Sequence, residues 1–456
     1  MNTTNYNKLF SFIWNIATDV LVYAFEKGEY KKIILPMMVL RRIDVLLEPT
    51  KKKTLEMKEA LNVAHINNQE ALLCNCTGYP FYNISKFTLK TLRSETDPLR
   101  LKMNFTDYLN GFSKDVQDII DNPDIPESKF PEEILMRLLC DQSSKRNIIW
   151  ATDDYAHLGE GFYFNQTIEI PLITGSFEGI IKPRSEKAKD IQNARSKDKA
   201  EVFTPSWVCN KQNNLIDEQW FGRPNVFNTE TENGWITNYN KIEFSDEPGK
   251  TWRDYVKDVR MEITCGEAPY ITSRYDTVTG KFIDPMDRIG ILDRKFRVVL
   301  ENYGPGTEYK KWFKWMRIAL ESTYGYEWQG DNLLLARENV LSSYIRFYTL
   351  RFGKKEFPPI KMLQEAIEVI TWNFWQMDGL KGVIPCTCVD KEIYDPQISL
   401  FDFGDSSPKY EPCPGCKSGE LKDMKLHTGI QCQIKDWDLE NDGKKKKVIY
   451  FHELMK

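Results

Sequence analysis

The stretch RMEITCGEAPYITSRYD, residues 260–276, decides how the second half of this chain is interpreted. It begins with the pattern of a short buried strand and then turns at Cys265 and Gly266. Glycine lets a ligand come close to the backbone, so this turn fits a cofactor loop. An ordinary loop after a strand has the same pattern, and the neighbouring segments must separate the two interpretations.

The region from residue 201 to residue 380 alternates between strand-like and helix-like segments. VRMEITCG has the pattern of a strand, and KKWFKWMRIALESTYGYEW that of a helix followed by a short strand. Two long helical patterns follow, DNLLLARENVLSSYIRFYTLRF and KMLQEAIEVITWNFWQM. This alternation predicts an α/β domain with a largely parallel sheet over residues 201–380.

The flanking regions differ in composition from this domain. Residues 1–121 carry apolar side chains at helical spacing and are predicted to form a helical domain. Three prolines in DNPDIPESKFPEE, residues 121–133, indicate a junction. Residues 122–200 are predicted to be a linker and a small α+β segment, with strands in NIIWATDDY, FNQTIEIPLITG and EGIIKP. Residues 381–456 are predicted to form a loop-rich tail that holds half of the ten cysteines.

Composition and charge narrow the class of protein. The length of 456 residues predicts two or three domains, and the net charge of −4 argues against a general polyanion binder. No apolar run reaches about 18 residues and the N-terminus lacks a signal-peptide pattern, so neither a membrane span nor secretion is expected. Cysteines without a framework spacing then predict reduced thiols in the cytoplasm, or a metal site. The charged residues 182–201 are expected to form a solvated helix, or alternatively a segment that faces nucleic acid.

Residues 1–121 resemble the N-terminal helical domain of the modification subunit of type I restriction-modification systems. LFSFIWNIATDVL, GEYKKIILPMMVLRRIDVLLEPTK and GYPFYNISKFTL carry this resemblance and occur in the family's order. In that family the domain precedes an adenine-N6 methyltransferase domain and helps to grip DNA beside the specificity subunit. NIIWATDDY, KAEVFTPSWVCNKQNNLIDEQWFG and YGYEWQGDNLLLARENVL resemble a second, less well characterised group of restriction or modification subunits.

The resemblance implies a fold, a function and partners. The fold is a helical N-terminal domain followed by an α/β domain, a divergent Rossmann-like methyltransferase. The function is S-adenosylmethionine-dependent methylation of adenine N6 in double-stranded DNA, in complex with the specificity and restriction subunits of the same system. The alternative is a DNA-binding or scaffold subunit that keeps the fold but has lost methyl transfer. A nuclease is a third possibility, suggested by the resemblance to proteins labelled as restriction subunits and by the acidic ATDDY of residues 151–155.

Two stretches on either side of residues 260–276 resemble parts of the family's cofactor site. EVFTPSWV resembles the Phe-Thr-Pro motif that lies against the methionine moiety, which assigns Phe203, Thr204 and Pro205 to the cofactor. Threonine followed by proline is also an ordinary helix start. In STYGYEWQGD, Glu327 ends a short strand, where an acid that binds ribose is expected. An exposed glutamate at a strand end has the same pattern.

EITCGEAPY resembles the family's loop Asp-Pro-Ala-Cys-Gly-Thr-Gly-Gly, aligned on its Cys-Gly pair. The cofactor loop then consists of Glu262 at the acidic position and of Thr264, Cys265 and Gly266. The second and third glycines of the family's loop are missing, and Glu267 and Ala268 follow instead. Side chains at these places would obstruct the close approach that glycine permits, although Glu267 could bind the cofactor's amino group.

The catalytic motif of the family is not present. Adenine-N6 methyltransferases of this type carry Asn-Pro-Pro and then Tyr or Phe, which orient the exocyclic amine and stack on an extruded base. No Asn-Pro-Pro occurs in this chain. The nearest stretch in order is ITWNFWQMDG, which makes Asn373 and Trp375 the predicted catalytic residues. The alternative is that this stretch contributes core residues at the end of a helix.

The tail contains a pattern of cysteines typical of a metal site. Cys386, Cys388, Cys413 and Cys416 form one C-x-C and one C-x₂-C pair, and His427 and Cys432 follow. Because four thiolates suit tetrahedral zinc, we expect a structural zinc ion there. Free thiols in a loop are the alternative.

Overall fold

The computed structural model describes residues 40–64, 69–94, 97–113, 116, 132–187, 195, 197, 204–303, 309–353, 358–393, 409–441 and 443–455. The chain divides into two compact units, Met1–Ile125 and Pro126–Lys456, and each is described by itself. Among the helices in these ranges, none is long and apolar enough to cross a membrane.

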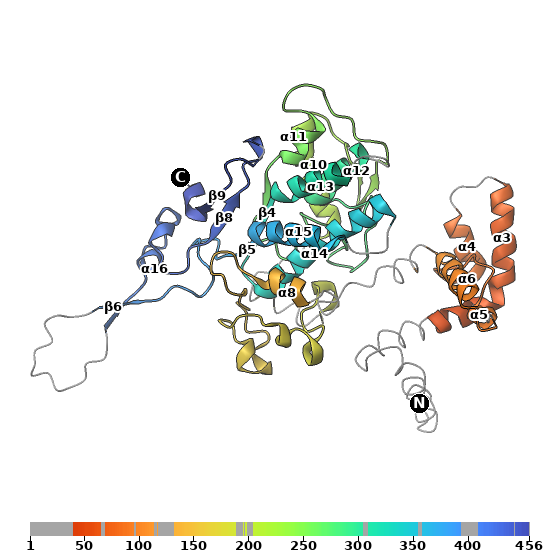
Figure 1. Ribbon diagram of the computed structural model, residues 1–456, viewed down its shortest axis with the longest axis horizontal. Helices are drawn as coiled ribbons and strands as arrows, with labels where there is room; N and C mark the ends of the chain where they lie inside the picture. The colour runs from red at the N-terminus through yellow and green to blue at the C-terminus, as the bar shows by residue number, and fades with distance from the viewer. Residues whose placement is uncertain are drawn as a thin grey trace, which may run out of the picture. The chain divides into compact units, whose positions relative to one another are not determined.

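The first unit is mainly helical in its described part (Figure 1). A 3-10 turn at Glu48–Thr50 leads into α3 (Lys51–Val63), α4 (Glu70–Thr77), α5 (Leu89–Leu92) and α6 (Pro98–Asn110). The predicted helical character of this region is therefore confirmed. The helical pattern LFSFIWNIATDVLVYAF lies outside the described residues.

A buried acid joins the pieces of this first unit. Asp44 accepts a hydrogen bond from the hydroxyl of Tyr108 at 3.1 Å and from the backbone N–H of Leu89, at the start of α5. Tyr108 is part of the core, with the buried apolar residues Leu40, Leu47, Leu92, Phe112 and Val116. Because a buried polar group needs a partner, these bonds fix how α5 and α6 meet.

The second unit is built on a three-stranded parallel sheet in the order β3-β4-β5. Its strands are β3 (Arg260–Glu262), β4 (Thr323–Glu327) and β5 (Phe374–Gln376). Helices α12 (Ile291–Asn302) and α13 (Tyr309–Glu321) connect β3 to β4. Helices α14 (Gly330–Phe352) and α15 (Ile360–Asn373) connect β4 to β5. The predicted alternation of strands and helices, with parallel pairing, is confirmed for this part of the chain.

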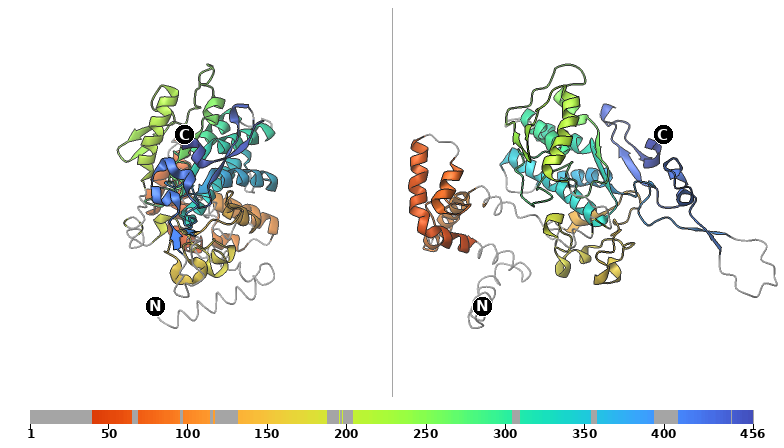
Figure 2. Two further views of the ribbon diagram at one scale, coloured as in Figure 1. Left: turned by 90° about the vertical axis from the view of Figure 1, so that its left-hand side faces the viewer. Right: turned by 180° about the vertical axis from the view of Figure 1, so that it is seen from behind.

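The two faces of this sheet are covered differently. Helices α12 to α15 pack together on one side, and the C-terminal hairpin of β8 (Gln433–Asp436) and β9 (Lys447–Tyr450) lies on the other (Figures 1 and 2). Tyr326 and Trp375 of the sheet meet Ile434 and Phe451 of the tail in a buried cluster. Strands β4 and β5 are therefore buried on both faces, whereas the edge strand β3 leaves Met261 exposed.

The remaining elements surround this centre. They are α8 (Glu132–Leu139), α10 (Ser206–Phe221), the hairpin β1 (Asn228–Thr231) and β2 (Gly234–Thr237), α11 (Trp252–Lys257), the pair β6 (Lys391–Ile393) and β7 (Lys409–Glu411), α16 (Pro414–Ser418), and 3-10 turns at Leu421–Leu426, Leu439–Asn441 and Phe451–Met455. Helix α8 packs on α14 and α15. It buries Ile134, Leu135, Leu138 and Leu139.

The strands predicted in residues 147–181 are wrong. This part contains isolated bridges, such as Ile149 with Thr167, and short 3-10 turns at Ala156–Leu158, Glu160–Phe162, Ile170–Leu172 and Gly175–Phe177. Trp150 is fully buried against Tyr155 and Phe162, whereas Tyr163 and Phe164 are exposed. Backbone bonds pair Trp150 with Gln166 and Ile168 with Ile148, and Ile149 between them bonds through its own N–H and carbonyl to the side chain of Gln376. The apolar pattern thus predicted strands where the backbone forms only isolated bridges.

Candidate functional site

A cavity of about 1140 Å³ opens where β3 and β4 end. Its floor includes Glu262, which ends β3, and Glu327, which ends β4. The walls come from the loop after β3, from α10 and from the segment around Asp153. Ligands of open α/β sheets bind in this place, outside the carboxyl ends of parallel strands.

The loop after β3 has an unusual backbone. Thr264, Gly266 and Ala268 have positive φ angles of 48°, 54° and 63°. A β-branched threonine and an alanine rarely adopt this conformation, so the loop stores strain of a kind that collects at binding sites. A Cβ atom added at Gly266 would meet nothing within 4 Å, so this position lies against open space. The backbone of the loop therefore faces the cavity closely at residue 266.

Glu327 ties the two strand ends together. Its Oε2 accepts a hydrogen bond from the N–H of Gly266 at 2.8 Å, and its Oε1 accepts one from the N–H of Gln329 at 3.2 Å. Burial raises the pKa of Glu327 to about 7, against the opposing effect of these two N–H donors. Each oxygen keeps a second lone pair, so the carboxylate can still accept bonds from a ligand in the cavity.

Glu262 is a second acid in the cavity wall. Burial raises the pKa of its carboxyl well above the usual range, although the backbone N–H groups of Tyr270 and Ile271 oppose the rise. Its Oε2 is shielded from solvent and has no hydrogen-bond partner among the described residues. A buried acceptor without a partner is costly, and a ligand that donates a hydrogen bond or carries positive charge would satisfy it.

Glu267 is held by the protein itself. Its carboxylate accepts hydrogen bonds from the N–H of Arg184 at 2.6 Å and from the hydroxyl of Tyr275 at 2.7 Å. These bonds favour Glu262 over Glu267 as the acid that would meet a positively charged group. The side chain of Glu267 is turned toward Tyr275, so it does not fill the space in front of Gly266.

The Phe-Thr-Pro stretch is only partly described. Phe203 lies outside the described residues, Thr204 lines the cavity, and Pro205 lines a separate hollow. Helix α10 begins directly after Pro205, as the sequence indicated. The N–H of Ser206 in its first turn donates to Asp276 at 2.9 Å, so the end of the segment 260–276 satisfies a backbone donor at the start of this helix.

The segment at residues 149–154 forms a wall that the sequence did not predict. Ala151, Thr152 and Asp153 line the cavity, and the indole N–H of Trp328 donates to the carbonyl of Ala151 at 3.2 Å. Asp154 is paired with Arg195 at 2.5 Å, so the two acids of ATDDY do not act together as metal ligands. The resemblance of NIIWATDDY to the second family group was the only signal for this wall.

Basic residues expected in a solvated helix are partly buried here. Lys187 and Arg195 lie 3.5 Å and 3.0 Å from the carboxylate of Asp331, at the start of α14. Burial would raise the pKa of Asp331, but these two ion pairs lower it below its usual value. These two side chains therefore hold the fold beside the cavity and do not face solvent.

The structure does not support the predicted catalytic roles of Asn373 and Trp375. The amide nitrogen of Asn373 donates to the carbonyls of Leu320 and Thr323, and its oxygen accepts from the indole N–H of Trp437 at 2.7 Å. Trp375 is buried against Phe451 on the face covered by the tail. Neither residue lines the cavity, because Asn373 at the end of α15 and Trp375 in β5 are both buried in the core.

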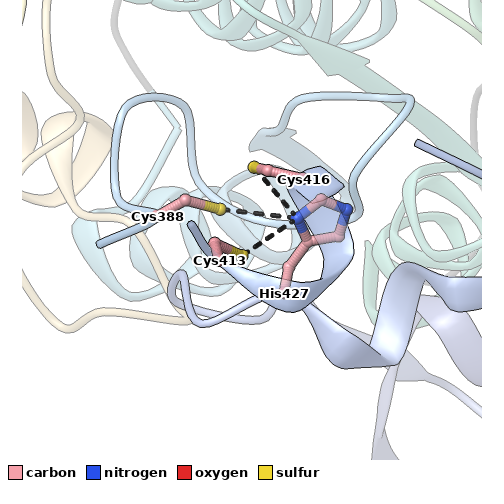
Figure 3. Close-up of side chains that lie close together, drawn as sticks. All are labelled: Cys388, Cys413, Cys416 and His427. Atoms are coloured by element: carbon pink, nitrogen blue, oxygen red, sulfur yellow. Dashed lines mark hydrogen bonds between the residues drawn. The ribbon is translucent and has the colours of Figure 1, made fainter. Parts of the chain in front are cut away.

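Three of the four cysteines predicted to bind a metal come together in the structure, and the fourth does not. Cys388, Cys413 and Cys416 come together, and His427 takes the fourth place that was assigned to Cys386 (Figure 3). Cys386 is exposed and lines the cavity instead. This is the only group of this kind among the described residues. The sequence pattern showed His427 near the cysteine pairs but did not assign it as a ligand, because no fixed spacing connects it to the C-x₂-C pair.

The chain thus has an α/β unit with a cavity at its strand ends, preceded by a helical unit. Residues 9–139 match the family model described as the HsdM N-terminal domain. At the level of this domain, the match supports the modification subunit of a type I restriction-modification system. No curated protein and no solved structure matches the chain.

Proposed function

We propose that this chain is the DNA modification subunit of a type I-like restriction-modification system, and that it methylates adenine N6 with S-adenosylmethionine bound in the cavity. The single observation that carries the cofactor is the convergence of Glu262, the Gly266 loop and Glu327 on one cavity. The domain match over residues 9–139 supports the type of system. Double-stranded DNA and the specificity and restriction subunits are the proposed partners, in the cytoplasm.

The residues present suit the parts of this cofactor. The ionised carboxylate of Glu327 would accept a hydrogen bond from each of the two ribose hydroxyls, one on each oxygen. It would keep its hydrogen bonds from the N–H groups of Gly266 and Gln329. The unpartnered Oε2 of Glu262 would accept a hydrogen bond from the positively charged amino group of the cofactor. The cavity of about 1140 Å³ is large enough, since small-molecule sites span about 300–1000 Å³.

The cofactor supplies a methyl group on a sulfonium, which is already a good leaving group. What the chain must add is the positioning of cofactor and base in a site that excludes water. The buried carboxyls and the wall residues Ala151, Thr152 and Asp153 would form the cofactor side of such a site.

A second candidate function is a subunit that binds the cofactor or DNA without methyl transfer. The burial of Asn373 and Trp375 favours it, because the stretch nearest in order to the place of the Asn-Pro-Pro motif is part of the core. The described sheet also favours this candidate. Its three parallel strands correspond to one βαβαβ half of a doubly wound fold.

Calorimetry with S-adenosylmethionine tests the cofactor site on the full chain. We expect wild-type protein to bind, and Glu327→Gln to bind about 10- to 100-fold more weakly, because charge-assisted hydrogen bonds to the ribose are lost. Glu368→Gln is the matched control, since Glu368 on α15 pairs with Lys435 away from the cavity, and it should bind like wild type. A wild-type protein that does not bind S-adenosylmethionine would contradict the proposal.

Methyl transfer separates the two candidates. Radiolabelled cofactor is incubated with double-stranded DNA and the chain in complex with its specificity subunit, and the DNA is digested to nucleosides. Label in N6-methyl-2′-deoxyadenosine supports the modification subunit. Binding of cofactor without labelled nucleoside supports the second candidate.

A further inference from the structure

Four side chains in the tail come together from three separate segments (Figure 3). Cys388 precedes β6, Cys413 and Cys416 lie at the start of α16, and His427 follows the turn Leu421–Leu426. Their ligand atoms all lie within 4.8 Å of one another. A cluster assembled from residues up to 39 positions apart is a product of the fold and not of local sequence.

The distances in this cluster fit a tetrahedron around one ion. The Nδ1 atom of His427 lies 3.5, 3.7 and 3.6 Å from the Sγ atoms of Cys388, Cys413 and Cys416. With Zn–S bonds of about 2.3 Å and a Zn–N bond of about 2.0–2.1 Å, tetrahedral geometry puts sulfur and nitrogen about 3.6 Å apart. The three distances agree with this edge length.

Hydrogen bonding alone does not account for the arrangement. A single imidazole nitrogen has either one proton or one lone pair, so Nδ1 can serve one thiol well but not three at once. A central cation bound to all four atoms satisfies every one of them together. The donor set of three sulfurs and one imidazole nitrogen is typical of zinc.

The surroundings leave room for the cluster and support it. A Cβ atom at Gly415 would lie 2.5 Å from Cγ of His427, and one at Gly429 would lie 3.1 Å from Sγ of Cys388. Both glycines therefore let the backbone pass close to the ligands. The N–H of Thr428 donates to Sγ of Cys413 at 3.2 Å, an outer contact of the kind that orients metal ligands.

We propose that Cys388, Cys413, Cys416 and His427 bind one zinc ion. Four protein ligands complete the tetrahedron and leave no open position, so the ion is structural. The ion joins the loop at Cys388 to α16 and to the segment at His427. Next to these segments, the N–H of Ile384 donates to the carbonyl of Ile430 over the sheet. The ion thereby holds the tail on the face of β4 and β5. This inference does not depend on the proposed cofactor.

Metal analysis of the purified full chain tests the ligand set. We expect about one zinc per chain in wild type and in Cys386→Ser, which changes the exposed cysteine two positions from Cys388. Cys413→Ser and His427→Ala should lose the zinc. His427→Cys should retain it, because a fourth thiolate restores a complete tetrahedral set. Loss of zinc from Cys386→Ser with retention in His427→Ala would overturn the proposal in favour of four cysteines.

A second measurement covers the case in which a variant does not fold. Cobalt(II) replaces zinc in wild-type protein, and the visible spectrum reports its geometry and sulfur ligands. We expect the intense bands of tetrahedral cobalt with sulfur-to-cobalt charge transfer. Wild-type protein with neither zinc nor these cobalt bands would show that the cluster does not bind a metal.

Discussion

Glu327 is a carboxyl group shielded from water, and its charge therefore depends on pH near neutrality. Its pKa rises from 4.5 in the unfolded chain to about 7 in the folded chain. Between these values the folded chain binds a proton that the unfolded chain does not. The contribution of Glu327 to the free energy of unfolding is therefore highest below pH 4.5. It falls as the pH rises to 7, by about 3 kcal/mol at most.

Glu327→Gln should remove this pH dependence. The variant loses one of the two bonds to N–H groups, at a cost of about 1 kcal/mol. We therefore expect it to be roughly 2 kcal/mol more stable than wild type at pH 8 and no more stable at pH 4. Urea unfolding at several pH values measures the difference, with Glu368→Gln as the control. A constant difference across this range would show that Glu327 does not titrate there.

Single residues show what the sequence could and could not reveal. The order of FTP, Cys-Gly and YGYEW placed Thr204, Gly266 and Glu327 correctly around one cavity, because strand ends of a parallel sheet meet at one edge. The sequence could not decide whether Cys386 or His427 joins the cluster of metal-binding residues. The two cysteines of a C-x-C pair can point in different directions, so one of them need not face the cluster. Which one faces a partner depends on the turn, and Cys386 has a positive φ of 61°.

At the scale of elements, the start of α14 and the wall of the cavity depend on each other. A Cβ atom at Gly330 would lie 2.0 Å from the carbonyl oxygen of Ile149 and 3.0 Å from Cδ1 of Ile168. The N–H of Gly330 also donates to the carbonyl of Trp150 at 3.0 Å. The segment at residues 149–154 can keep its place only while residue 330 has no side chain.

Gly330→Ala should therefore destabilise the second unit by about 2 kcal/mol or more, despite the higher helix propensity of alanine. Gly234→Ala is the matched control, because a Cβ atom there meets only Oγ1 of Thr231 at 3.4 Å. Urea denaturation of the full chain measures both variants. Equal stability of the two variants would mean that the contact of α14 with Ile149 relaxes at little cost.

The elements also separate predictable from unpredictable structure. Helices α13 to α15 and strands β3 and β4 were predicted from the pattern of each segment alone. The structure of residues 147–181 could not be predicted in this way, because side chains far away in the sequence hold this segment in place. Gln376 on β5 bonds to both the N–H and the carbonyl of Ile149, which lies 227 positions earlier. No local pattern reports such a bond.

At the scale of the whole chain, the family match and the compact units have different boundaries. The match continues to residue 139, whereas the second unit begins at Pro126. The difference contains α8, whose apolar side chains pack on α14 and α15. The guanidinium of Arg337, fully buried in α14, donates to the carbonyls of Leu138 and Cys140 and to that of Phe374 in β5. Helix α8 is thus part of the core of the second unit.

This predicts which fragment of the chain folds. Four buried Ile and Leu side chains of α8 contribute about 6–12 kcal/mol at about 1.5–3 kcal/mol each, which is comparable to the stability of a whole domain, about 5–15 kcal/mol. A fragment of residues 126–456 should unfold cooperatively in urea. A fragment of residues 140–456, cut where the family match ends, should lack a cooperative transition, because it exposes the α8 site and leaves Arg337 with one bond fewer. Cooperative unfolding of both fragments at the same urea concentration would show that α8 adds nothing to the second unit.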